Sequence, residues 1–412
     1  MASFPRFTFH AASLAAVALL AGAPAWSQQD RSVPDAPLAA VVHASNRFAL
    51  DFYRDLSAHE AGQNIFVSPY SVSTALAMAC EGSRKETRSQ MAAVLHLDLP
   101  DAKRRAGYSA LLAGTNPGEG KTYKLEVANA LWGQKDFHFE PAFTSALKDS
   151  YGGGFNLVDF AGSSEASRGT INAWVEQKTA GKIRDLIHPS DLTPLTRLVL
   201  TNAIYFKSAW ASPFKKQSTQ TADFHVTASK AVPVPMMALS ERFLFVRRPG
   251  VAAIELPYAG NDLSMVVILP DGDIDAFGAS LSLDSLQKLR SEMKGQQVDL
   301  SLPRFKFETR SYLEQVLSRM GMPDAFNAKR ADFSGMTGKP NLSISHVIHQ
   351  AMINVDEEGT EAAAATAVIM SLKAMRVVER ESFRADRPFL FLIVHNPTGS
   401  ILFMGRVSDP SK

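Results

Sequence analysis

Residues Glu357-Glu-Gly-Thr-Glu-Ala-Ala-Ala-Ala-Thr366, continued by Ala367-Val-Ile-Met-Ser-Leu-Lys-Ala-Met375, are the most informative segment of this chain. By intrinsic propensity, four consecutive alanines after a Thr-Glu start favour a helix. Taken alone, the segment therefore predicts a helix. Only the remainder of the chain can change that interpretation.

The composition indicates one large globular domain. The chain has 412 residues, of which 46% are hydrophobic and 20% charged, so it can bury a substantial core. No Pro-, Gly- or Ser-rich linker and no fixed-period repeat divides it. The net charge of +2 gives no general reason to bind nucleic acid or an anionic membrane.

Two short basic runs interrupt this balance. They are Arg84, Lys85 and Arg88, and then Lys103, Arg104 and Arg105. Such runs more often form a solvated helix face than a polyanion site, and we interpret them in that way.

The N-terminus has the pattern of a cleaved export signal. A lone Arg6 precedes an apolar run over 11–25, with small residues shortly before position 28. A membrane anchor is the alternative, but the run is shorter than the roughly 20 residues that a spanning helix needs. We expect 1–27 to be a signal peptide and 28–412 to be a secreted or periplasmic mature domain. A single cysteine, Cys80, excludes an intramolecular disulfide, and its apolar helical surroundings predict inert packing.

Local patterns predict helices first and strands last. Helical spacing predicts helices at 38–56, 72–78, 171–187 and 312–320, with Ser68-Pro69 as the start signal of the second and Gly321 as the end of the last. Runs rich in β-branched and aromatic residues predict strands at 125–132, 197–206, 264–269, 298–307, 389–395 and 401–407. Asn396-Pro-Thr-Gly399 predicts that the last two strands form a hairpin. This order favours an α+β fold.

No set of residues predicts an enzyme, a metal site or a cofactor. Ser145-Ala-Leu-Lys148 and Ser212-Pro-Phe-Lys215 match a nucleophile pattern so short that it arises by chance, and its companion motifs are missing. His346 and His349 lack a third ligand and would face opposite sides of a strand. We therefore expect an exported binder or inhibitor.

Ordered motifs along nearly the whole mature chain resemble the serpin family. In chain order they are Asn64-Ile-Phe-Val-Ser-Pro-Tyr-Ser-Val72, Asn129-Ala-Leu-Trp132, Thr179-Ala-Gly-Lys-Ile183, Leu200-Thr-Asn-Ala-Ile-Tyr-Phe206, Glu255-Leu-Pro-Tyr258, Leu302-Pro-Arg-Phe305, Asp332-Phe-Ser-Gly335, Arg387-Pro-Phe-Leu-Phe391 and Phe403-Met-Gly-Arg406. The resemblance implies an α+β serpin fold of about nine helices and three β-sheets. It further implies a metastable native state and an exposed reactive centre loop at about 358–377.

The resemblance changes the interpretation of the alanine segment, which matches the hinge of that loop. The hinge residues are Glu357, Gly359, Thr360, Glu361, Ala362, Ala363, Ala364, Ala365 and Thr366. In this family the loop becomes a new central strand after a protease cuts it. Small side chains suit that insertion. With period-two alternation, Thr360 and Ala362 would point inward and Glu361 outward.

The mechanism implied by the resemblance is a trap that consumes the inhibitor. A protease attacks the loop, forms an acyl-enzyme and is carried across the sheet as the loop inserts. In the family's usual register the bond between Lys373 and Ala374 is cut, and a lysine there favours trypsin-like targets. A cut after Leu372 or Met375 would favour chymotrypsin- or elastase-like targets, and one after Arg376 trypsin-like targets.

Two polar clusters match positions that control insertion in the family. The shutter cluster comprises Ser68, Ser71, Asn202 and His349, and the breach cluster comprises Trp210, Tyr258, Arg304 and Glu357. Ordinary buried packing is the competing interpretation of both. Alternative functions are a non-inhibitory carrier, chaperone or cleavable substrate, and an inhibitor of papain-like cysteine proteases. We expect a monomer whose partner is its target protease.

Overall fold

A six-stranded sheet with an unusual central pairing organises the fold. In this computed structural model its strands lie in the order β10-β11-β12-β4-β2-β3, and β11 also pairs directly with β4. The structure describes residues 36–116, 118, 120–361 and 380–412, all within the compact unit Ser32–Lys412. The predictions for 1–27, Ala362 to Thr366, Lys373 and Ala374 fall outside these residues.

The strands of the six-stranded sheet come from distant parts of the sequence. They are β2 (Tyr123–Gln134), β3 (Gly154–Val158), β4 (Leu198–Ala209), β10 (Phe305–Tyr312), β11 (His346–Val355) and β12 (Gly359–Thr360). The strand β4 pairs antiparallel with β2 and parallel with β11. Of these two long neighbours, only β11 runs in the same direction as β4.

A nine-stranded sheet forms the second layer. Its order is β1-β15-β14-β8-β7-β6-β9-β13, with β5 attached to β6. Its strands are β1 (Ile65–Val67), β5 (Gln220–Thr227), β6 (Lys230–Arg248), β7 (Val251–Pro257), β8 (Leu263–Pro270), β9 (Lys294–Pro303), β13 (Arg380–Arg384), β14 (Phe389–His395) and β15 (Ser400–Val407). Because the long strand β6 pairs with β5 near one end and β7 near the other, two of the three expected sheets join into one.

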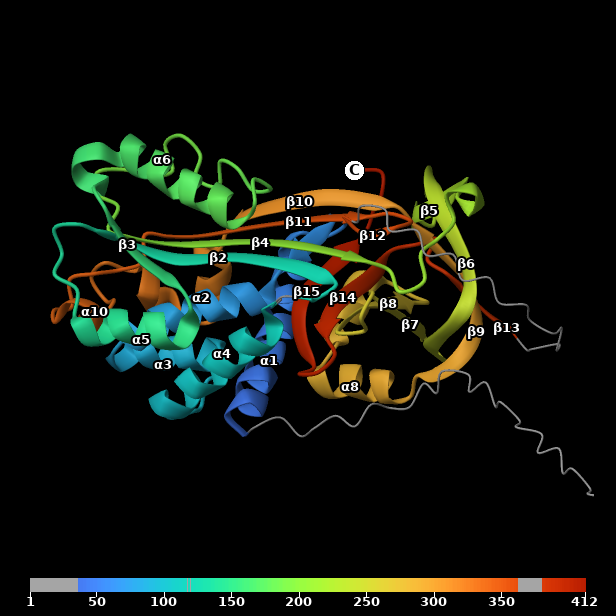
Figure 1. The fold of residues 1–412 in the computed structure, drawn as a ribbon, viewed down its shortest axis with the longest axis horizontal. Helices are drawn as coiled ribbons and strands as arrows, with labels where there is room; N and C mark the ends of the chain where they lie inside the picture. Colours follow the sequence, from blue (N-terminus) through green and yellow to red (C-terminus); the bar gives the residue numbers. More distant parts are fainter. Residues whose placement is uncertain (1–35, 117, 119, 362–379) are drawn as a thin grey trace, which may run out of the picture. The chain divides into compact units, whose positions relative to one another are not determined.

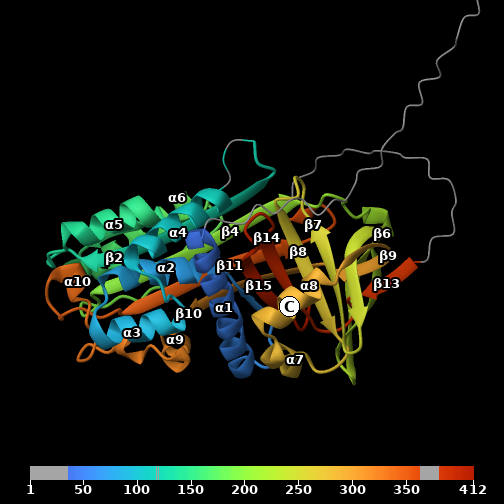
Figure 2. The same ribbon diagram turned by 90° about the horizontal axis from the view of Figure 1, so that it is seen from below.

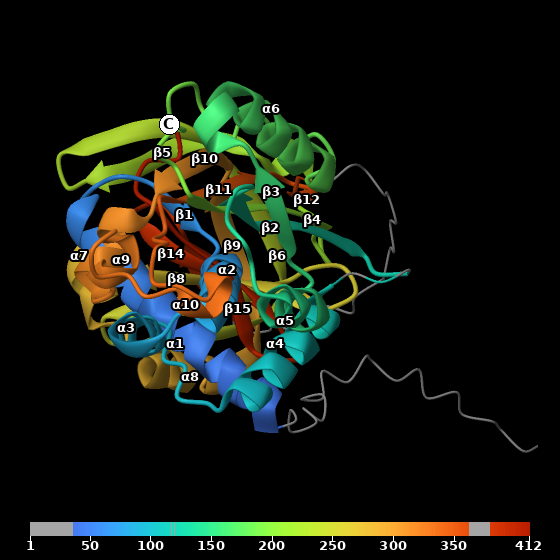
Figure 3. The ribbon, with the colours of Figure 1, turned by 90° about the vertical axis from the view of Figure 1, so that its left-hand side faces the viewer.

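Helices cover both faces of the six-stranded sheet. Figures 1 and 3 show α6 on the opposite side of β2 from α4 and α5. The helices are α1 (Ala36–His59), α2 (Pro69–Gly82), α3 (Lys85–Val94), α4 (Asp101–Thr115), α5 (Pro141–Tyr151), α6 (Phe160–Lys178), α7 (Ile274–Ser280), α8 (Leu283–Ser291), α9 (Glu314–Met320) and α10 (Ser334–Thr337). No helix of the described residues is long and apolar enough to cross a membrane.

Strong local patterns are confirmed. The helix α2 begins after Ser68, whose hydroxyl accepts a hydrogen bond from Ser71 N–H, with Pro69 at the first helical position. Strands β14 and β15 form the predicted antiparallel hairpin, seen at the centre of Figure 2. Cys80 is buried, as predicted, and burial raises the pKa of its thiol.

Two predicted boundaries are wrong. The helix predicted over 171–187 ends at Lys178, because Ala180 and Gly181 take positive φ angles of 50° and 75°. The strand predicted over 298–307 is two strands in different sheets, since β9 ends at Pro303 and β10 begins at Phe305. A period-two pattern cannot reveal such a crossing, because the residues on each side of it satisfy the pattern equally well.

Candidate functional site

The seam between β4 and β11 is the candidate site. The two strands pair in parallel from Val199 with His346 to Tyr205 with Met352, and beyond that point they no longer pair with each other. The two-residue strand β12 takes the place between them. It is antiparallel to both neighbours, with Thr360 opposite both Val355 and Ser208. One end of the seam is thus already occupied by the predicted hinge.

Gly359 and Thr360 fit this place for steric and polar reasons. Gly359 has φ +154°, and a Cβ there would lie 2.1 Å from the carbonyl oxygen of Ser208, so a side chain is excluded. The Thr360 side chain is buried, and its hydroxyl lies 2.7 Å from the hydroxyl of Tyr258. Glu361 instead forms an ion pair with Lys182. Thr360 is therefore directed into the core, whereas Glu361 is directed to the opposite face of the sheet.

The four predicted breach residues meet at this end of the seam. The rings of Trp210 and Tyr258 stack with centroids 4.6 Å apart. The Trp210 indole N–H donates to the carbonyl oxygen of Asp356 at 2.9 Å. Arg304 donates through both Nε and Nη2 to one carboxylate oxygen of Glu357, at 2.9 and 2.5 Å. An arginine gives this two-fold donation, which a lysine at the same position would not.

Glu357 is a buried charge with matched partners. Its side chain is only 2% exposed. Burial raises the pKa of the carboxyl, but hydrogen bonds from Arg304 and Thr219 outweigh burial and hold that pKa below its ordinary value. Glu357 therefore stays ionised and fixes the turn from which the hinge begins.

The shutter residues meet midway along the seam. Asn202 on β4 and His349 on β11 are paired in register, and the His349 Nδ1 lies 2.5 Å from the Asn202 Oδ1. Below them, Ser68 N–H donates to the His349 Nε2 at 3.2 Å. The Asn202 amide donates to the Ser71 hydroxyl at 2.7 Å. The start of α2 is thus hydrogen-bonded to both strands of the seam.

These contacts fix the protonation state of His349. Because Nε2 accepts a hydrogen bond from a backbone N–H, the proton of the neutral ring lies on Nδ1 and is donated to Asn202. Burial lowers the pKa of His349 to about 4. The cluster is therefore neutral at pH 7.

Asn129 also belongs to this cluster, although the sequence did not single it out. It lies opposite Asn202 in the β2 to β4 register. Its Oδ1 accepts from Ser71 Oγ at 3.0 Å and from the Asn202 amide at 2.5 Å. The signal was a second asparagine in a buried strand, but only the register shows that the two asparagines are neighbours.

Comparisons with known proteins agree with this geometry. The family model described as "Serpin (serine protease inhibitor)" matches residues 43–410. The chain belongs to the serpin family. An uncharacterized serpin-like protein of Thermococcus kodakarensis is 41% identical over 90% of this chain and 86% of its own. Human leukocyte elastase inhibitor is 40% identical over 89% of this chain and 98% of its own. Human thyroxine-binding globulin complexed with thyroxine superimposes with a TM-score of 0.82 at 30% identity, covering 92% of this chain and all of its own.

The opposite face of the serpin seam is covered by the segment that follows α6. Ile183, Leu186 and Ile187 are completely buried there. They belong to one hydrophobic cluster with Ala203 of β4 and Ile348 of β11. This segment therefore packs across the two strands that an inserted loop would have to separate.

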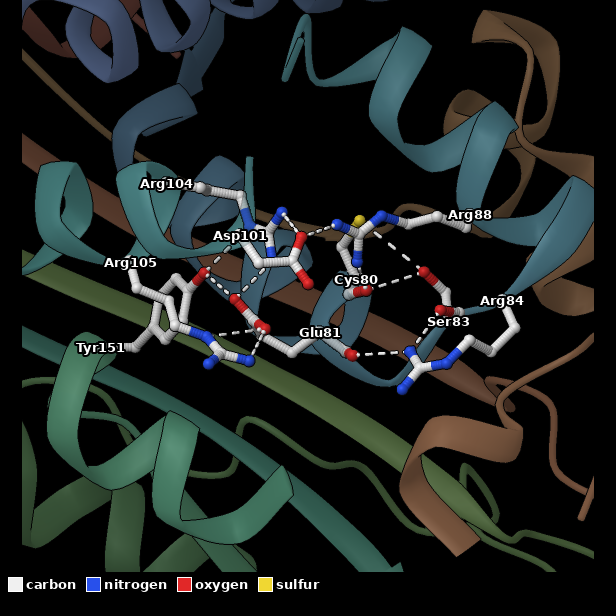
Figure 4. A network of polar contacts seen from close by, with 9 residues as sticks. All are labelled: Cys80, Glu81, Ser83, Arg84, Arg88, Asp101, Arg104, Arg105 and Tyr151. Carbon is white, nitrogen blue, oxygen red and sulfur yellow. Dashed lines mark hydrogen bonds and ion pairs between the residues drawn. The ribbon is translucent and has the colours of Figure 1, made fainter. Parts of the chain in front are cut away.

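Most basic side chains of the two runs in this serpin bind acceptors within the protein, although only Arg104 is buried (Figure 4). The Arg104 side chain is 1% exposed, and its Nη2 donates to Glu81 Oε1 at 2.6 Å. Arg105 binds the other Glu81 oxygen at 2.7 Å. Arg88 binds Asp101 at 2.5 Å. The interpretation of these residues as a solvated face is wrong for Arg104, because a buried carboxylate 23 positions away neutralises it.

His346 does not join His349. Its Nδ1 lies 3.1 Å from Glu314 Oε1, whereas His349 is completely buried in the shutter cluster. Among the described residues, no group of three His, Cys, Asp or Glu side chains is arranged to hold a metal ion.

Proposed function

We propose that this serpin inhibits proteases by the suicide mechanism, in which the cleaved loop inserts between β4 and β11. One observation carries the proposal: Gly359 and Thr360 already lie between these strands and pair antiparallel with both. A longer insertion would extend the same pairing and add two new ladders of backbone hydrogen bonds. Cleavage frees the far end of the loop and makes that gain readily accessible.

The seam supports insertion chemically. The bonds that join its two strands through side chains come from neutral amide, hydroxyl and imidazole groups. Neutral hydrogen bonds can be exchanged for others at low net cost, whereas separating a buried ion pair would strand a charge. The shutter cluster therefore suits a sheet that must open once.

We assign the reactive bond to Lys373 and Ala374 and the target to trypsin-like serine proteases, whose specificity pocket pairs a buried carboxylate with a cation. A cut after Leu372 or Met375 by an elastase-like protease is the alternative assignment. The name of the human relative, leukocyte elastase inhibitor, favours this alternative. A papain-like cysteine protease is the third target class. The site of cleavage distinguishes the serine protease assignments directly.

A carrier function is the competing proposal, because the thyroxine-binding relative shares the fold. A carrier needs no loop insertion, so cleavage of its loop need not yield a covalent complex. We further propose that 1–27 directs export to the periplasm or the extracellular medium and that the mature protein is a monomer. N-terminal sequencing of the exported protein and its mass in solution test these two proposals.

The deciding experiment mixes the mature protein in molar excess with trypsin and examines the products by denaturing gel and mass spectrometry. We expect a covalent complex joined through Lys373. Thr360→Arg should abolish the complex and leave a cleaved substrate, because Thr360 is buried against Tyr258 and a charge cannot follow it into the core. Lys339→Ala, at an exposed position, is the matched control.

Clean cleavage by trypsin, elastase, chymotrypsin and papain without any complex would overturn the inhibitor proposal. A complex joined through Leu372 or Met375 would keep the mechanism and correct the target class.

A further inference from the structure

The strand β12 ends at Thr360, and Glu361 is the last described residue of the hinge. Its N–H still donates to the carbonyl oxygen of Asn354 at 2.8 Å, so it remains in the ladder with β11. Its φ angle is +48°, however, which is a strained, left-handed value for a residue with a Cβ. The backbone of Glu361 therefore departs from the strand conformation of β12, and an interaction that stabilises this conformation would oppose further pairing.

The side chain of Glu361 is held by two partners from different elements. The Lys182 ammonium forms an ion pair with the Glu361 carboxylate and lies 5.3 Å from the centre of the Tyr205 ring. Burial, and then the negative charge of Glu361, raises the pKa of the Tyr205 phenol. Tyr205 is the last residue of β4 that pairs with β11, so this contact sits at the point where the seam begins.

Lys182 is presented by a rigid turn. The Thr179 hydroxyl accepts from Ile183 N–H at 3.1 Å, and Gly181 N–H donates to the carbonyl oxygen of Glu176 at 2.8 Å. Ile183 is completely buried against the sheet. The ammonium is therefore positioned by the same segment that covers the seam.

We propose that Lys182 and Tyr205 form a latch that holds Glu361 at the turn and limits insertion of the intact loop to Thr360. The next residue enters only when the φ angle of Glu361 returns to the β region, which reorients its Cα–Cβ bond and withdraws the carboxylate from Lys182. Lys182 is thus a positioning residue for loop insertion. This inference rests on the proposed inhibitory function.

The latch keeps the unused inhibitor from inserting its own loop. Without Lys182, the ammonium that pairs with the Glu361 carboxylate is lost, so the intact loop inserts faster and active inhibitor is lost. The cleaved form has already passed this step, and its stability does not depend on the latch.

The test follows conversion of the intact mature protein at a warm, non-denaturing temperature. Two quantities are measured with time: the fraction that still forms a covalent complex with a protease, and the fraction that becomes resistant to urea. We expect conversion about two- to fivefold faster in Lys182→Ala and in Glu361→Ala, the range for a partly exposed ion pair. Lys182→Arg should behave like the wild type. Lys178→Ala, an exposed lysine on the last turn of α6, is the control.

The double variant Lys182→Ala with Glu361→Ala should convert no faster than either single variant, because both remove the same contact. Thermal unfolding of the cleaved form should be unchanged by Lys182→Ala, which a purely structural role would alter. An unchanged or slower conversion in Lys182→Ala, or additive effects in the double variant, would overturn the latch and leave the inhibitory function standing. A wild-type protein that forms no complex and never becomes urea-resistant would overturn both.

Discussion

Two buried polar clusters in this protein are built from different chemistry. The shutter cluster, including Asn129, connects β4 and β11 with neutral groups. The cluster around Glu81 connects α2, α4 and α5 with charges: Arg104, Arg105 and the Tyr151 hydroxyl all bind one carboxylate (Figure 4). Both clusters involve α2, the first at its beginning and the second at its end.

The difference in charge between the two clusters fits their positions in the fold. Hydrogen bonds to Arg105 and Tyr151 outweigh burial and hold the pKa of Glu81 below its ordinary value, so Glu81 is a buried anion. Losing one partner of such a cluster is costly, because the remaining charge stays buried and unpaired. The charged cluster thus suits helices that stay together, and the neutral cluster suits strands that separate in the proposed mechanism.

The largest effect is expected at the charged cluster. Glu81→Ala removes the buried carboxylate that pairs with Arg104 and leaves this arginine only the exposed carboxylate of Asp101, so it should lower the free energy of unfolding by about 3–5 kcal/mol. Denaturant titration of the intact and the loop-cleaved forms should show a similar loss in both, with the exposed Asp98→Ala as control. A loss confined to the intact form would mean that these helices also move during insertion.

The pH dependence of the free energy of unfolding should distinguish the shutter cluster from the cluster around Glu81. The pKa of His349 is about 4 in the folded protein against an ordinary value of 6.5, so the unfolded chain binds more protons between these values. Stability is then complete above pH 6.5 and falls as the pH decreases toward 4, by roughly 3 kcal/mol. Glu81 contributes only at the acid end of this window, because its pKa is lowered from 4.5 and the carboxyl of the unfolded chain begins to bind a proton there.

The measurement is denaturant titration of the intact protein across this pH range. His395 is a second buried histidine with a pKa of about 4, so its contribution has to be removed separately. His349→Gln and His395→Gln should each flatten part of the profile. An unchanged profile in His349→Gln would contradict the assignment to the shutter cluster.

A smaller effect is expected for Asn202→Ala, which removes the amide that joins Ser71, Asn129 and His349. We expect the intact form to lose about 2 kcal/mol, the range for unpaired buried hydrogen-bonding groups. The loop-cleaved form should lose less, because insertion in the proposed mechanism separates Asn202 from His349. Asn156→Ala on the edge strand β3 is the control, and equal losses in both forms would mean that the seam contact survives insertion.

Particular residues show which features can be predicted from the local sequence. Ser68 and Pro69 predicted the start of α2, and Gly321 predicted the end of α9, because caps depend on neighbouring residues alone. The family resemblance named the seam residues on both sides. Its motifs include Asn129 and Lys182 but give neither residue a role, because these roles depend on strand register and on a turn packed over the sheet.

Local sequence is enough to predict the helices and strands with strong periodicity, the lack of an intramolecular disulfide in a chain with one cysteine, and the small residues of the hinge. Which charges are buried, and which residue pairs with Glu361, depends on the packing of distant segments. Arg104 resembles any surface arginine until α4 packs on α2 and brings Glu81 to it. Glu361 likewise contacts Lys182, 179 positions earlier in the chain, only because β12 lies in the seam. Side-chain partners at such separations follow from packing, which no local pattern encodes.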